Sequence, residues 1–131
     1  MVSGQVRIRL NADGDPIPEV FVRLLVKGFN GQEINVETIL DTGFSGSLSL
    51  RQSDIDALGL LPSFQILTIL ADGSLRTVAT YTAFVEWDGI DQIVETLGDD
   101  QHPFLGMGLL LNRNVSMNVV GGGVVQITRL N

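Results

Sequence analysis

One carboxylate stands out by its place in the sequence. A largely apolar run from Val36 to Leu40 ends at Asp41, and Thr42 and Gly43 follow directly. Gly43 permits a turn with positive φ, which would lift Asp41 out of the strand end and present it at a surface. A carboxylate held in this way can serve as a general acid or base. The alternative is a plain turn, because Asp, Thr and Gly are all common turn residues.

Two further segments share the chain with this motif. Pro103 to Gly106 lies some sixty residues beyond Gly43 and leads into the apolar stretch Met107 to Leu111. Between the two motifs, Leu70 to Ser74 contains an Asp-Gly pair that suits the two-residue type I′ turn of a β-hairpin. The order and spacing of the three segments therefore bear on whether Asp41 is a catalytic residue or a plain turn residue.

In this context the chain resembles the retropepsin-like aspartic proteases, of the bacterial and archaeal type with an Asp-Thr-Gly-Phe core. Ile39 to Gly43 is similar to their first signature and Phe104 to Gly106 to their second, and the resemblance covers roughly residues 19 to 130. It implies a catalytic Asp41 supported by its two neighbours, a psi-shaped loop at the second signature, and a flap at Leu70 to Ser74. The site residues implied are Asp41 (catalytic), Thr42 and Gly43 (supporting), Phe44, Ala71, Asp72 and Gly73 (substrate-binding), and Leu105 and Gly106 (psi-loop).

A single Asp-Thr-Gly has a consequence for assembly. Aspartic protease chemistry uses two nearby carboxylates that share one proton, so that one acts as base on a water and the other donates to the scissile carbonyl. A chain with one such Asp needs a second copy, and two-fold symmetry would place Asp41 against Asp41 of that copy. The resemblance further implies hydrogen bonds between the Thr42 hydroxyls across the axis. It also implies interleaved terminal strands, for which Gln5 to Leu10 and Val124 to Leu130 are the candidates.

The chain departs from the retroviral pattern in two places. Phe44 stands where retroviral enzymes carry a small residue, so we expect it to narrow the cleft or fill a substrate pocket. Met107 follows Gly106 where those enzymes have an Arg, and Ser45 and Gly46 occupy the region of the acid that pairs with this Arg. Both halves of that ion pair are therefore absent together.

The overall composition narrows the class of protein. The chain has 131 residues, 44% of them hydrophobic and 18% charged, which indicates a single globular domain over residues 1–131. It has no cysteine, and a reducing, cytoplasmic location is expected. Its start lacks a secretory apolar region and no run approaches a membrane span. With a net charge of −7 and scattered basic residues it presents no basic face for nucleic acid.

The element pattern is mostly β. Alternating runs predict strands that include Gln5 to Leu10, Glu19 to Lys27, Glu33 to Leu40 and Leu75 to Trp87. Short helices are expected at Ser53 to Gly59, with Ser53 as its cap, and at Leu109 to Asn112. Further strands are expected at Ser47 to Leu50, Phe64 to Leu70, Gln92 to Leu97, Val115 to Val120 and Val124 to Leu130. Short strands with Gly-rich turns favour an all-β fold, a retropepsin-like closed β-barrel with one or two short helices and one lobe per chain.

Other candidate groups have simpler explanations. His102 is the only histidine, and without cysteine a metal site would need a rare cluster of acids, so we expect no metal and no cofactor. Ser45 or Ser47 lacks the strand-turn-helix context of a hydrolase nucleophile. Asp99 and Asp100 are expected in a solvated loop, and Asp72 is better explained as a turn residue than as a second catalytic acid. Gly121 to Gly123 is expected to form a hairpin turn, since it has no Lys and opens no helix.

The function hypothesis is a homodimeric aspartic endopeptidase that hydrolyses peptide bonds in peptide or protein substrates with water activated by an Asp41 pair. The alternative is a catalytically weak or inactive retropepsin-fold module that dimerises or binds extended peptides, because strand pairing in a cleft gives affinity without chemistry. The intact Asp41-Thr42-Gly43 favours the enzyme, and Phe44 favours the alternative.

Overall fold

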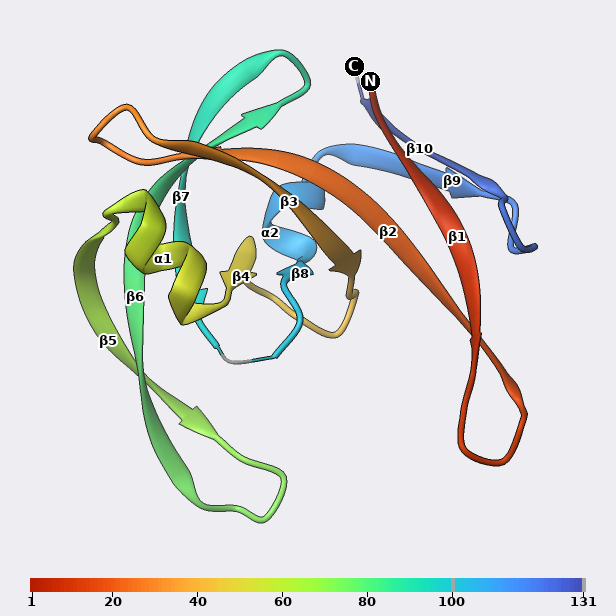
Figure 1. Cartoon of the computed structure of the whole chain (residues 1–131), viewed down its shortest axis with the longest axis horizontal. Helices are drawn as coiled ribbons and strands as arrows, with labels where there is room; N and C mark the ends of the chain where they lie inside the picture. The colour runs from red at the N-terminus through yellow and green to blue at the C-terminus, as the bar shows by residue number, and fades with distance from the viewer. Residues whose placement is uncertain (100, 131) are drawn as a thin grey trace.

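The computed structural model describes residues 1–99 and 101–130. These residues form mostly β-sheet with two short helices, which confirms the expected β-rich fold with one or two short helices (Figure 1). The strands are β1 (Val2–Leu10), β2 (Pro16–Lys27), β3 (Glu33–Leu40), β4 (Leu48–Leu50), β5 (Leu61–Ile69), β6 (Leu75–Trp87), β7 (Ile90–Gly98), β8 (Phe104–Leu105), β9 (Arg113–Met117) and β10 (Val124–Arg129). The helices are α1 (Gln52–Leu58) and α2 (Met107–Leu110).

All ten strands belong to one hydrogen-bonded sheet in the order β5-β6-β7-β4-β8-β3-β2-β1-β10-β9. An additional pairing joins β6 back to β2, through Leu25 to Lys27 and Phe84 to Glu86. The pairings of β2, β3, β8, β4, β7 and β6 therefore form a cycle of six strands. Within this cycle β8 is parallel to β3, and β4 is parallel to β7, while the remaining pairs are antiparallel.

The terminal strands lie outside the six-strand cycle. β1 pairs with β2 along Gln5 to Leu10 and with β10 along Val2 to Gln5, so the two chain ends lie side by side (Figure 1). β10 pairs with β1 on one edge and with β9 on the other. Over Val125 to Ile127, both edges of β10 are thus occupied within its own chain. The interleaving expected for Val124 to Leu130 involves a second chain and stays a prediction.

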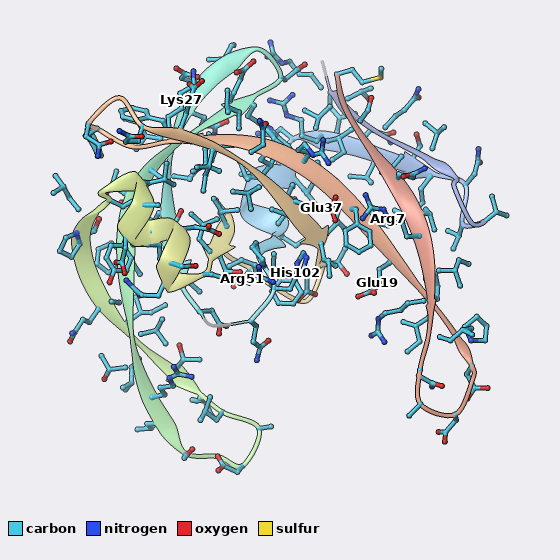
Figure 2. The ribbon with its side chains drawn as sticks, viewed as in Figure 1. Arg7, Glu19, Lys27, Glu37, Arg51 and His102 are labelled. Carbon is cyan, nitrogen blue, oxygen red and sulfur yellow. The ribbon has the colours of Figure 1, made fainter. Side chains whose placement is uncertain are left out.

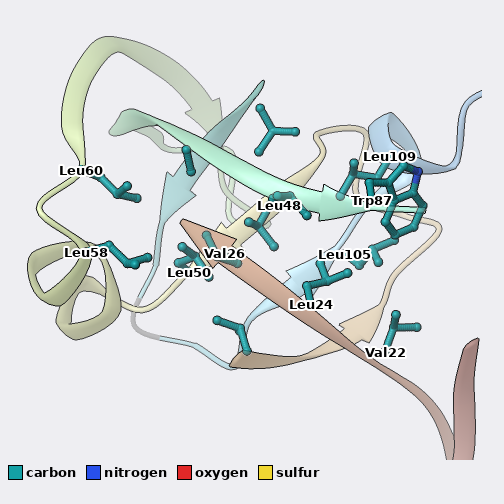
Figure 3. Packing of buried hydrophobic residues seen from close by; sticks show 14 of the residues in the cluster. Val22, Leu24, Val26, Leu48, Leu50, Leu58, Leu60, Trp87, Leu105 and Leu109 are labelled. Atoms are coloured by element: carbon teal, nitrogen blue, oxygen red, sulfur yellow. The ribbon is translucent and has the colours of Figure 1, made fainter. Parts of the chain in front are cut away.

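The core lies inside the cycle and follows from strand alternation. Val22, Leu24 and Val26 on β2 are buried, and so are Val85 and Trp87 on β6, while the residues between them are less buried. The short central strand β4 is buried at all three positions. Figure 3 shows these side chains packed together with residues of β8 and both helices. The burial of this apolar cluster is the main contribution to the stability of the strands that carry Asp41.

Two turn details correct the sequence interpretation. In the β5–β6 turn only Gly73 has positive φ, at 83°, and its N–H donates to the carbonyl of Leu70. A type I′ turn requires positive φ at both central residues, so the expected type at Asp72-Gly73 is wrong. The I′ pattern occurs instead at Asp88-Gly89, with φ of 55° and 80° in the two-residue connection from β6 to β7.

The helices also differ in detail from the sequence interpretation. α1 begins after Arg51, and no side chain caps it, so Ser53 is not its cap. Gly59 ends it in the left-handed conformation, as expected. α2 begins at Met107, two residues before the expected Leu109. No helix in the described residues has the length and apolar character needed to cross a bilayer.

Candidate active site around Asp41

Asp41 begins the loop that connects β3 to β4. β8 is inserted between these two strands: Leu105 pairs with Leu40 of β3 on one side and with Leu48 of β4 on the other. The backbone N–H of Asp41 donates to the carbonyl of Leu105 at 2.9 Å. The two motifs that the sequence places some sixty residues apart are therefore joined directly, and β8 crosses between the two ends of the Asp41 loop (Figure 1).

The Asp41 side chain is fixed by its own turn. One carboxylate oxygen, Oδ1, accepts the N–H of Gly43 at 2.9 Å, and the Asp41 carbonyl accepts the N–H of Phe44 at 3.2 Å. Asp41 is half-buried, whereas Thr42 and Gly43 are exposed. The carboxylate is thus oriented by a backbone donor at the molecular surface. The hydrogen bond expected between two Thr42 hydroxyls involves a second chain and stays a prediction.

Phe44 packs back onto Gly46, in the loop after the first signature, and onto Gly106 of the second signature. A Cβ built at Gly46 would lie 2.6 Å from the Phe44 ring, and one at Gly106 would lie 2.6 Å from the ring and 2.1 Å from the Gly46 carbonyl oxygen. The Phe44 carbonyl also accepts the N–H of Met107 at 2.8 Å. Phe44 therefore joins the Asp41 loop to the start of α2, in the region where the retroviral ion pair is absent. Gly46 and Gly106 are required because the ring occupies the space that their side chains would fill.

A pocket of about 210 Å³ opens beside Asp41. The Phe44 ring forms part of its wall, so the expectation that this residue shapes a pocket agrees with its position. The pocket also brings in Asp99, which lies in the loop directly after β7, as expected, but is half-buried there; Asp100 lies outside the described residues. The lining residues include Asp41, Phe44, Ser49, Leu97, Asp99 and Phe104.

Asp99 is the residue that sequence reasoning missed. Its backbone N–H donates to the carbonyl of Leu50 at 2.8 Å, which continues the parallel pairing of β7 with β4. Because β4 follows the Asp41 loop, this pairing carries Asp99 to the same pocket. The only signal in the sequence is its place shortly before Phe104, and the parallel β4–β7 pairing that positions it cannot be inferred from local pattern.

The β5–β6 hairpin carries the residues expected in a flap. Ala71, Asp72 and Gly73 lie exposed at its tip, and a Cβ at Gly73 would have no neighbour within 4 Å. The hydroxyl and N–H of Ser74 both donate to Asp72, and these hydrogen bonds lower the pKa of the Asp72 carboxyl. Asp72 is therefore a turn residue, as the sequence indicated. The three tip residues line neither the pocket beside Asp41 nor a second pocket that lies beneath the hairpin.

Beneath the hairpin lies a second pocket of about 170 Å³, between β5, β6 and the end of β7. Leu70 and Arg76 of the hairpin line one side of it, and Leu97 and Asp99 line the other. The hairpin residues that face the body of the protein are thus Thr68, Leu70, Arg76 and Val78, not the three predicted from the tip.

His102 lies in the loop before β8 and has a packing role. Its ring makes an edge contact with Phe21 at 6.0 Å between centroids, and its Nδ1 is 3.0 Å from the carbonyl oxygen of Pro103. The Arg7 guanidinium lies over the Phe21 ring, 4.3 Å from the ring centre. Arg7 also forms a bidentate ion pair with Glu37, at 2.6 and 2.9 Å (Figure 2). Within the described residues no group of three or more His, Asp or Glu side chains is arranged to hold a metal ion.

A larger pocket of about 530 Å³ lies elsewhere, beside α2 and β9. Its Arg113 side chain is largely buried and forms an ion pair with Asp88 at 3.0 Å. Arg129 lies 3.8 Å from the same carboxylate. Both cationic side chains that line this pocket are thus already paired with Asp88, and we place the candidate site at Asp41, where the carboxylate has only backbone donors among the described residues.

No protein-family model and no curated protein matches the chain. Among solved structures, the chain is similar to the crystal structure of a retropepsin-like aspartic protease from Rickettsia conorii. The sequence identity is 19% and the TM-score 0.49, over 96% of this chain and 91% of that chain. A likeness of this degree says nothing about which residues form a site.

Proposed function

We propose that this chain is a retropepsin-like aspartic endopeptidase that is active as a symmetric homodimer. The observation that carries the proposal is the insertion of β8 between β3 and β4, with the Asp41 N–H bonded to Leu105 and the Asp41 carboxylate bonded to Gly43. This arrangement holds one carboxylate at an exposed loop in a fixed orientation. The six-strand cycle supports the retropepsin-like barrel, and the single sheet supports one domain per chain.

The proposed chemistry follows from pairing this carboxylate with its symmetry mate. Two carboxylates in close contact cannot both be ionised, so the pKa of one is raised and the pair holds a single proton. The ionised Asp41 takes a proton from water as the water oxygen bonds to the peptide carbonyl carbon, and the protonated Asp41 of the second copy donates to the carbonyl oxygen. The tetrahedral centre then collapses to the carboxylic acid: the C–N bond breaks and the proton taken from water passes to the leaving amine. Thr42 and Gly43 hold the loop, the β5–β6 hairpin covers the substrate, and no metal or cofactor takes part.

The test is Asp41→Asn, which keeps the size of the side chain and an oxygen to accept the Gly43 N–H but removes the base. Cleavage of a peptide library between pH 3 and 8 should fall by a factor of about one hundred to ten thousand. Folding should survive, and dimerisation followed by sedimentation should be equal or tighter, because the repulsion between two carboxylates is removed. Equal cleavage by both proteins, or a wild-type protein that stays monomeric at every accessible concentration, contradicts the proposal.

A second candidate function is a catalytically inactive module that dimerises or binds extended peptides. The observation in its favour is Phe44, a large side chain in the wall of the pocket beside Asp41. Peptide binding by the wild type and by Asp41→Asn, with cleavage by neither, would decide for this function.

A further inference from the structure

The pocket beside Asp41 and the pocket beneath the β5–β6 hairpin adjoin, and we refer to them together as the groove. Leu97 and Asp99 line both of them, so the two spaces meet at these side chains. One end of the groove is Asp41 and the other is the inner face of the hairpin, where Arg76 lies. A peptide bound with its cleaved bond at Asp41 would therefore have a neighbouring side chain enter the groove and reach Asp99.

The walls of the groove next to Asp41 are apolar. Phe44, Leu97 and Phe104 line it, and besides Asp41 the charged side chain among its lining residues is Asp99. Such a site accommodates a side chain that has a long apolar stem and a polar end, as lysine and arginine do.

The Asp99 carboxylate is held in place and is available to a ligand. Its Oδ1 accepts the N–H of Gln101 at 3.2 Å, and its backbone is fixed to Leu50. In the described part of the chain, no cationic group lies within 4 Å of Asp99, although Arg76 lines the second pocket together with it. A half-buried carboxylate with apolar neighbours gains most from a cationic partner that also donates hydrogen bonds.

We propose that Asp99 determines specificity by binding a lysine or arginine side chain of the substrate, at a position next to the cleaved bond. The inference rests on the proposed function, because it takes the groove beside Asp41 to be the substrate cleft. The stem of the basic residue packs between Phe44, Leu97 and Phe104, and its cationic end reaches the Asp99 carboxylate. The net charge of −7 favours the approach of basic peptides over acidic ones.

The experiment uses short peptide libraries that are identical except at one fixed position, which holds lysine, arginine, norleucine or glutamate. Norleucine has the stem of lysine without its charge. Cleavage is measured with the wild type by mass spectrometry, and binding is measured with Asp41→Asn, which removes the other carboxylate of the pocket. We expect the basic libraries to be cleaved and bound roughly tenfold to a hundredfold better than the norleucine library, the range of a charge-assisted hydrogen bond.

Three variants test the role of Asp99. Asp99→Asn keeps the acceptor for Gln101, and it should abolish the preference for lysine over norleucine. Asp99→Lys should reverse the preference toward glutamate. The matched control is Asp56→Asn on the exposed side of α1, outside both pockets, which removes the same charge and should retain the wild-type preference.

The outcomes separate this inference from the proposed function. Cleavage by the wild type with no preference for basic residues, or an unchanged preference in Asp99→Asn, overturns the inference and leaves the peptidase intact. Binding with a preference that depends on Asp99, but without any cleavage, supports the inference and overturns the peptidase. Absence of binding to every library overturns both. The comparison between libraries in the parent protein decides the inference even if a variant at position 99 does not fold.

Discussion

At the scale of single residues, the Asp41 loop is held together by an aromatic ring and two glycines. Phe44 lies against Gly46 of its own loop and Gly106 of the second signature, and its backbone bonds to both Asp41 and Met107. Close packing of this kind leaves no space for an added methyl group. The residue that departs most visibly from the retroviral pattern is therefore also one that fixes the position of the proposed catalytic carboxylate.

A methyl group at Gly106 tests this packing. In Gly106→Ala the new Cβ would meet the carbonyl oxygen of Gly46 and the Phe44 ring, so the loop has to shift. We expect the free energy of unfolding to fall by about 1–3 kcal/mol, the usual cost of overpacking, and Asp41 to be displaced. Denaturant unfolding measures the first effect.

Gly121→Ala is the control, because the nearest atom to a Cβ at that position is 3.8 Å away, on Ile8. It should change stability by no more than about 0.5 kcal/mol. Equal stability of the Gly106 and Gly121 variants would show that the ring and the glycines are not tightly packed.

At the scale of elements, two hairpins show how far a local motif can be trusted. Asp72-Gly73 and Asp88-Gly89 are the same dipeptide between apolar strands, yet only the second forms a type I′ turn. The difference lies in the strand register: Trp87 pairs with Ile90, which leaves two residues in the loop, whereas Ile69 pairs with Leu75, which leaves five. Register is determined by pairing along the whole strand, and the dipeptide only has to be compatible with it.

The exposed β5–β6 tip leads to a prediction about activity. Gly73 has a φ of 83°, a conformation that a β-branched residue resists, and its surroundings are empty. Gly73→Val should therefore lower peptide cleavage by the proposed enzyme more than it lowers the melting temperature, because it distorts the tip and leaves the core unchanged.

Gly73→Asn serves as the control, since asparagine tolerates positive φ better than other residues, and it should retain most of the cleavage. Cleavage rates and thermal melts of the three proteins decide the matter. A Val variant with wild-type cleavage would mean that the tip does not act on substrate.

At the scale of the whole molecule, an ion pair links β1 to β3 and makes stability depend on pH. The hydrogen bond from Arg7 lowers the pKa of the Glu37 carboxyl below its usual 4.5, with smaller contributions from the charges of Arg7 and Arg23. A carboxyl whose pKa is lowered by folding adds stability above its usual pKa, and this stability is lost as the pH falls through the lowered value.

We therefore expect the free energy of unfolding of the wild type to decrease as the pH falls below the usual pKa of Glu37, 4.5, and through the lowered pKa of the folded state. Glu37→Gln and Arg7→Gln should each flatten that decrease, because either substitution removes the pair. Urea titrations at a series of pH values provide the measurement. Parallel pH profiles for all three proteins would show that the pair does not contribute.

The features that the sequence predicted correctly differ in physical origin from those that it did not predict. The bounds of β3 and β6 were predicted correctly, because strong alternation and clear turns mark them. The place of Asp41 at the end of β3 followed from the same local signals. The pocket contacts of Asp99 and the packing of the Phe44 ring depend on the β4–β7 pairing and on glycines far apart in sequence, and no local pattern encodes these.

The two occupied edges of β10 also bear on the order in which the protein forms. Because β1 and β9 of the same chain complete the hydrogen bonding of β10, the terminal sheet needs no strand from elsewhere. We therefore expect the folding rate of the chain to be independent of its concentration, and the association of two chains in the proposed dimer to be a separate step. In the proposed dimer we therefore expect subunits to exchange without unfolding, and dilution to inactivate the proposed enzyme reversibly.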